Sequence, residues 1–99
     1  MDRRTNDIQR IQSAVGSRKQ ESEDLRRLIG ERISAARRRA RLSQGELAER
    51  IGTHNWTVSR YETGRMFPHL TLLRRMSTAL DVSTDYLLGL DRRPPEGRP

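Results

Sequence analysis

The chain has 99 residues, of which 32% are hydrophobic, and a formal net charge of +7. This length fits one compact domain with tails. The absence of cysteine excludes disulfide scaffolds, zinc fingers and cysteine nucleophiles, and it agrees with a cytoplasmic protein. Charged residues interrupt every apolar run well before the length of a membrane span, so we expect no membrane association.

The basic residues are nearly all arginine, because Lys19 is the only lysine among 20 basic residues. A planar guanidinium group can pair bidentately with a phosphate or with the edge of guanine. A nucleic-acid partner is therefore a reasonable first hypothesis. A GC-rich genome would also enrich arginine, so composition alone leaves both explanations open.

Residues 1–22 show only a weak hydrophobic periodicity. Ile8, Ile11 and Val15 recur at helical spacing, which indicates at most one short amphipathic helix. The following "GSRKQESED" is typical of a linker. We expect a flexible or partly helical arm, and the alternative is a docked or dimerising helix that could bind a partner protein.

The first helix of the domain is expected to begin at Ser22, which can act as its N-cap. Glu23 and Asp24 then stand in the first turn, where carboxylates interact favourably with the helix dipole. The apolar stripe that continues to about residue 40 consists of Leu25, Ile29, Ile33, Ala36 and Ala40.

A second helix begins with a complete start signature. Ser43 and Glu46 have the spacing of a capping box, and Leu42 and Leu47 have that of a hydrophobic staple. Gly52 is expected to end this helix in a left-handed conformation. The turn that follows is too short for an antiparallel hairpin, so a sharp crossing is expected.

Three further helices are predicted. The third runs from about His54 to Glu62, with Thr53 as its cap and Gly64 after its end. A fourth and a short fifth follow, the latter capped by Ser83. Their apolar residues are Leu70, Leu73, Met76, Ala79 and Leu80 in the fourth, and Tyr86, Leu87 and Leu88 in the fifth.

The sequence thus predicts an all-α fold, a compact five-helix domain over residues 23–90. It lies between the arm of residues 1–22 and a proline-rich, disordered tail of residues 91–99. The second and third helices have the features of a helix-turn-helix. Ala48 permits a close approach of the two helices, and the apolar residues that face the core are Leu47, Ile51, Val58 and Tyr61.

A helical wheel of the third helix places its tryptophan outside the core. At about 100° per residue, Val58 and Tyr61 share one side and Trp56 lies on the other. The outward residues are of types that read DNA, since Asn pairs with adenine and Arg with guanine in the major groove. The alternative for Trp56 is contact with a neighbouring helix or a dimer interface. The outward arc consists of Asn55, Trp56, Ser59 and Arg60.

With these features the chain resembles the lambda-repressor-like, Xre/Cro-type helix-turn-helix family. The resemblance covers about residues 29–89 and rests on "LSQGELAERIGT", "ETG" and "DYLLG". It implies a sequence-specific regulator of transcription, of the repressor type, from a prokaryote or phage. Such a protein binds a double-stranded DNA operator as a homodimer, without a cofactor.

The resemblance also implies roles for single residues. Gln44 is expected to contact a phosphate and to brace the third helix, and Arg37 and Glu62 to form a partly buried ion pair. Arg65 is expected to contact a phosphate. The base-reading positions are Asn55, Trp56, Ser59 and Arg60, and the other backbone-contacting positions are Thr53, His54 and Thr57.

Four positions depart from the family pattern. Arg41 and Asp81 stand where glycine is common, so the first helix is expected to end differently. Arg74 stands where an apolar residue is frequent. Trp56 replaces a polar residue, which means that the operator sequence cannot be borrowed from relatives.

The surplus of apolar residues near the end of the domain suggests a dimer seam, and closure of the core is the alternative. The seam candidates are Tyr86, Leu87, Leu88 and Leu90.

Two other functions stay open. The chain could be the antitoxin of a toxin–antitoxin pair that neutralises a partner protein and regulates its own promoter. It could also be a protein adaptor with no DNA affinity. An enzyme is not expected, because His54 and His69 have no metal-ligand spacing and no nucleophile stands near either.

Overall fold

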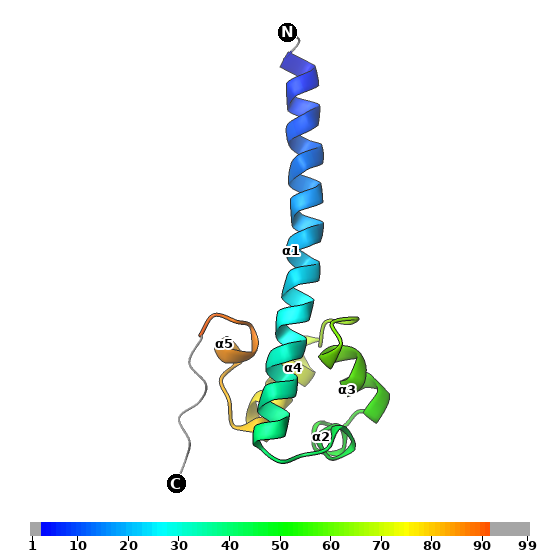
Figure 1. Cartoon of the computed structure of the whole chain (residues 1–99), viewed down its shortest axis with the longest axis vertical. Coiled ribbons are helices and arrows are strands. Elements are labelled where there is room, and N and C mark those ends of the chain that lie inside the picture. The colour runs from blue at the N-terminus through cyan, green and yellow to red at the C-terminus, as the bar shows by residue number, and fades with distance from the viewer. Residues whose placement is uncertain (1–2, 92–99) are drawn as a thin grey trace.

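The computed structural model describes the backbone of residues 3–91 and the side chains of residues 16–91. Within this part every regular element is a helix, and the all-α, five-helix prediction is confirmed (Figure 1). The helices are α1 (Arg3–Arg39), α2 (Gln44–Ile51), α3 (Asn55–Glu62), α4 (Leu70–Leu80) and α5 (Thr84–Leu87).

Helix α1 is much longer than the sequence pattern indicated, with 37 continuous residues. The expected linker over residues 16–24 is helical, and Ser22 lies inside α1 instead of capping it. Five of the nine residues of this stretch are Arg, Lys, Gln or Glu, which favour helix and outweigh Gly16 and the poorer helix formers Ser17, Ser22 and Asp24. In Figure 1 the N-terminal half of α1 projects away from α2–α5.

Burial along α1 nevertheless begins near the expected domain boundary at residue 23. The side chains of residues 16–22 are exposed, and Leu25 is the first apolar side chain described that packs against the core. The side chains of Ile8, Ile11 and Val15, and the tail from residue 92, lie outside the described residues. The boundaries drawn for the arm and the tail therefore stay predictions.

The core lies where the C-terminal half of α1 packs against α3, α4 and α5, and where α2 packs against α3 and α4. Two residues of the predicted stripes are not part of it. Ala40 is exposed because α1 ends at Arg39, and Leu70 is exposed in the first turn of α4, where Leu72 is buried instead. The largest fully buried side chains are Tyr61, Ile33, Leu47, Ile51, Met76, Leu87 and Val58.

The backbones of α1 and α3 approach closely at Gly30 of α1. A Cβ atom added there would lie 2.4 Å from the carbonyl oxygen of Tyr61 and 2.7 Å from that of Glu62. Both atoms belong to the backbone of α3, which cannot move aside as a side chain could. Only glycine therefore permits α1 and α3 to pack at this distance.

The start of α2 agrees with the sequence prediction. The Ser43 hydroxyl accepts a hydrogen bond from the Glu46 backbone N–H, and the Glu46 carboxylate accepts one from the Ser43 N–H, both at 3.0 Å. These hydrogen bonds lower the pKa of Glu46. Leu42 and Leu47 are both buried, as a hydrophobic staple requires.

The ends of α1 and α4 correct one expectation. Arg41 has φ 58° and Asp81 has φ 54°, so each residue adopts the left-handed conformation of the glycine it replaces. The Leu42 N–H donates to the Arg37 carbonyl at 3.1 Å, which is the bond of a Schellman motif. Helix α1 thus ends as a glycine-capped helix does, and not differently as expected.

Among the described helices, none has both the length and the apolar character needed to cross a membrane.

Candidate nucleic-acid interface

The turn between α2 and α3 is short, and the backbone N–H groups of Gly52 and Thr53 form hydrogen bonds with carbonyl groups of α2. Gly52 has φ 76°, and the Thr53 N–H donates to the Ala48 carbonyl at 2.9 Å. Thr53 therefore closes α2. The expectation that Thr53 is the N-cap of α3 is wrong. His54 takes that position, without a hydrogen bond from its side chain. The chain turns within residues 52–54, and α3 begins directly after them.

Helix α3 has one buried and one exposed side, as the wheel predicted. Val58 is 0% exposed and Tyr61 is 2% exposed, whereas Trp56 is 56% exposed. Thr57 is less accessible than the other expected backbone contacts, because the residue is only 7% exposed.

The outward arc is formed by Asn55, Trp56 and Arg60, which are exposed, and by Ser59, which is half-buried. The Trp56 ring stacks on the His54 ring with centroids 5.8 Å apart and an angle of 9° between the planes. The Arg60 guanidinium carbon lies 4.9 Å from the Trp56 ring centroid. These contacts hold the indole, and with it the guanidinium, in one orientation on the surface of α3.

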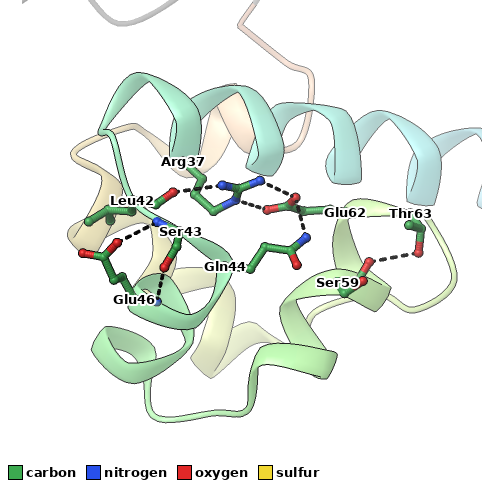
Figure 2. Close-up of polar contacts among 8 residues, drawn as sticks. All are labelled: Arg37, Leu42, Ser43, Gln44, Glu46, Ser59, Glu62 and Thr63. Atoms are coloured by element: carbon green, nitrogen blue, oxygen red, sulfur yellow. Dashed lines mark hydrogen bonds and ion pairs between the residues drawn. The ribbon is translucent and has the colours of Figure 1, made fainter.

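A polar network behind this arc joins three helices (Figure 2). Arg37 of α1 donates to both carboxylate oxygens of Glu62, from Nε at 2.6 Å and from Nη2 at 3.0 Å. Its Nη1 also donates to the Leu42 carbonyl at 2.9 Å. The ion pair expected between Arg37 and Glu62 is thus present, and its hydrogen bonds raise the pKa of Arg37.

Gln44 completes the network from the first turn of α2. Its Nε2 donates to the Glu62 Oε1 at 3.1 Å, so the expected bracing of α3 by Gln44 is present (Figure 2). The side chains of Arg37 and Glu62 are 12% and 7% exposed. They therefore serve to fix the end of α3 rather than to form part of a surface.

The segment after α3 carries Arg65, whose side chain is exposed. Its N–H donates to the Arg60 carbonyl at 3.0 Å, and Gly64 has φ 74°. Arg26, which the sequence pattern did not single out, supports this segment from α1. Its Nε donates to the Gly64 carbonyl at 3.3 Å, and its guanidinium lies over the Phe67 ring.

The proposed dimer seam is corrected in part. Leu87 is 0% exposed and Tyr86 is 8% exposed, because the short helix α5 inserts both into the core against α1 and α4. Arg32 covers the Tyr86 ring with its guanidinium, 4.7 Å from the centroid. Leu88 is half-buried, and Leu90 is 75% exposed. Only the last two offer apolar surface to a partner.

Among the described residues, no group of three or more His, Cys, Asp or Glu side chains is placed to hold a metal ion. The surface of α3 offers hydrogen bonding, positive charge and the exposed Trp56 ring.

Comparison with known proteins places these features in a family. The family model described as helix-turn-helix matches residues 33–87. The HTH-type transcriptional regulator ImmR of Bacillus subtilis is 40% identical over 63 residues, which are 64% of this chain and 50% of that protein. Repressor protein C2 of Salmonella phage P22 is 38% identical over 61 residues, which are 62% of this chain and 28% of that protein.

Antitoxin HigA1 of Mycobacterium tuberculosis is 39% identical over 69 residues, which are 70% of this chain and 46% of that protein. The chain thus spans half or less of the length of these three relatives.

Solved structures agree with the sequence matches. The P22 c2 repressor in complex with a synthetic operator has a TM-score of 0.62 and 38% identity, covering 65% of this chain and 97% of that one. A hypothetical transcription factor from Neisseria, NHTF, has a TM-score of 0.62 and 31% identity, covering 76% of this chain and 82% of that one.

Proposed function

The chain belongs to the lambda-repressor-like helix-turn-helix family, and from this premise we propose that it is a sequence-specific, double-stranded-DNA-binding regulator of transcription that acts as a repressor. The observation that carries the proposal is the exposed arc of α3. Its polar and aromatic side chains face outward while Val58 and Tyr61 are buried. The fold of the P22 repressor, solved with its operator, supports the same reading.

In this proposal α3 lies in the major groove and reads base edges. The Asn55 amide suits the N6 and N7 atoms of adenine, and the Arg60 guanidinium suits the O6 and N7 atoms of guanine. Trp56 offers an apolar surface for a thymine methyl group. Ser59 is half-buried, so it would reach a base or a phosphate only at the rim of the arc.

The sugar–phosphate backbone would be held on both sides of α3. Gln44 stands in the first turn of α2, where backbone N–H groups and the helix dipole favour an anion. Thr53 and His54 lie in the turn between α2 and α3, and Arg65 follows the end of α3. Thr57, which is only 7% exposed, would contribute least to these contacts.

We further propose that the protein acts in the cytoplasm as a homodimer on a two-fold operator, with half-sites about one DNA turn apart. Among the exposed large hydrophobic residues in the described part of the chain, only Leu70 is more exposed than Leu90. Leu90 and the partly buried Leu88 are the remaining candidates for the dimer contact. The function needs neither catalysis nor a cofactor.

The test is selection of bound sequences from random duplex DNA, followed by affinity measurement for the selected operator at several salt concentrations. Arg60→Ala should lower specific affinity by about 1–3 kcal/mol and relax one base position. Arg18→Ala removes the same charge from an exposed site on α1 and serves as the matched control. The proposal fails if no sequence is enriched, or if both variants lose affinity equally on all sequences.

A second candidate function is that of an antitoxin, and the 39% identity to HigA1 is the observation that favours it. The projecting half of α1 would then hold the toxin while the helix-turn-helix regulates the promoter. A stoichiometric complex with the product of a neighbouring gene, lost when residues 1–21 are removed while DNA binding persists, would support this function.

A further inference from the structure

A second cationic region lies outside the α3 arc. It is an open cleft of 540 Å³ between the C-terminal end of α2 and the outward side of α4. It shares no residue with the surface proposed to read DNA. Its lining consists of Arg50, Thr71, Arg74, Arg75, Thr78 and Ala79.

The lining is suited to an anion. Three of its six residues are arginines and two carry hydroxyl groups, whereas no acidic residue of the described part of the chain is among them. The ion pairs of Arg27 with Asp24 and of Arg37 with Glu62 both lie outside the cleft. Glu46, one turn before Arg50, has its carboxylate bound to the Ser43 N–H and also interacts electrostatically with Arg50.

One of the arginines is already held in place. Arg75 Nη1 donates to the Ile51 carbonyl at 3.1 Å, at the C-terminal end of α2. A Cβ atom added at Gly52 would lie 3.2 Å from the same nitrogen, so the guanidinium packs directly on the turn. A guanidinium has five N–H donors, and this contact uses one of them. The others can serve a ligand with little loss of side-chain freedom.

Apart from Arg50, all the lining residues lie on α4. Arg74 and Arg75 each lie three or four positions from both Thr71 and Thr78, and all four side chains are exposed. Arg74 stands at a position where the family often has an apolar residue. Here it lies on the solvent side of α4, opposite the buried Leu73 and Met76.

We propose that this cleft binds a ligand with two or more phosphate groups. Each of the three guanidinium groups has the fork geometry that phosphate oxygens match bidentately. The volume lies within the roughly 300–1,000 Å³ of small-molecule sites, well above the size of a single phosphate. The phosphates come either from a free polyphosphate compound such as a nucleotide or from the DNA backbone that flanks the α3 contact. The second source rests on the proposed DNA-binding function, and the first does not.

The experiment uses the full chain and inorganic pyrophosphate as the probe, with binding measured by calorimetry and by NMR shifts of the α4 amides at constant ionic strength. Arg74→Gln and Arg50→Gln should each weaken pyrophosphate binding about tenfold. Arg38→Gln, an exposed arginine outside the cleft, is the matched control and should leave binding unchanged. Arg74→Lys, which keeps the charge but not the fork, should bind with intermediate affinity.

The same variants titrated with operator DNA distinguish the two sources. If pyrophosphate does not bind, but Arg74→Gln weakens DNA binding and reduces its salt dependence more than Arg38→Gln does, the phosphates are those of the DNA backbone. The inference is overturned if cleft and control variants behave alike with both ligands. It is also overturned if pyrophosphate shifts residues elsewhere than α4 and the end of α2. Because the pyrophosphate arm contains no DNA, its failure is separate from that of the proposed function.

Discussion

The two halves of α1 form one continuous helix, but they differ in burial. The C-terminal half buries Ile29, Ile33 and Ala36 and touches α3, α4 and α5, whereas the side chains of residues 16–22 are all exposed. The backbone conformation is the same in both. The comparison teaches that helix formation and packing are separate contributions, and that only the packed half can transmit stability to the surface of α3.

The largest expected effect comes from the ion pair that joins the packed half to α3. Arg37→Met should reduce the free energy of unfolding by about 3–5 kcal/mol, because it leaves the buried Glu62 carboxylate with a single hydrogen bond from Gln44. Urea denaturation followed by circular dichroism measures this loss. Arg38→Met, at the exposed neighbouring position, is the control, and equal losses in both variants would contradict the role given to Arg37.

Gly30→Ala tests the close approach between α1 and α3. The added Cβ would overlap the Tyr61 carbonyl, so the helices must separate, at a cost of about 1–3 kcal/mol. The thermal midpoint should fall, although alanine is the better helix former. A midpoint that rises would show that the two backbones can move apart without loss.

Arg41→Gly tests the end of the packed half. Arg41 has φ 58°, and relief of this left-handed conformation should stabilise the domain by about 0.5–1 kcal/mol after the entropy of glycine is counted. Arg38→Gly removes the same charge within the helix and should destabilise by about 1 kcal/mol. If both variants lose stability, the strain assigned to Arg41 is absent.

Gly16→Ala should have the smallest effect on global unfolding. An added Cβ meets nothing within 4 Å, so the only change is a local gain in helix propensity of about 1 kcal/mol. We expect a larger helical signal in circular dichroism with an unchanged thermal midpoint. A shifted midpoint would mean that the projecting half contributes to the stability of the domain, and the comparison between the two halves would no longer hold.

Local features of this chain were predictable because they depend on residues a few positions apart. The capping box of Ser43 and Glu46, the end of α2 at Gly52 and the outward position of Trp56 all follow from helix geometry over one or two turns. The resemblance to a known family supplied the pair of Arg37 and Glu62, which are 25 residues apart. Spacing alone could not have identified that pair.

The errors arose where one weak local signal had to decide between two structures. Ser22 and Gly16 resemble the start of a helix and a linker, but neither outweighs the helix-forming residues around them. Thr57 lies at the border of the core on a wheel, and its burial depends on how closely α3 packs against the domain. Thr53 could have capped α3, yet its N–H closes α2.

The sequence by itself determined helices α2 to α5, most of the apolar stripes of the core and the chemical types on the outward arc of α3, since periodicity and capping are encoded within short stretches. Only the tertiary structure decided how close α1 and α3 approach at Gly30 and that Arg26 supports the loop after α3. It alone also brought Arg50 of α2 beside Arg74 and Arg75 of α4. These arrangements join residues distant along the chain, and the packing of whole helices, rather than any local pattern, sets the distances between them.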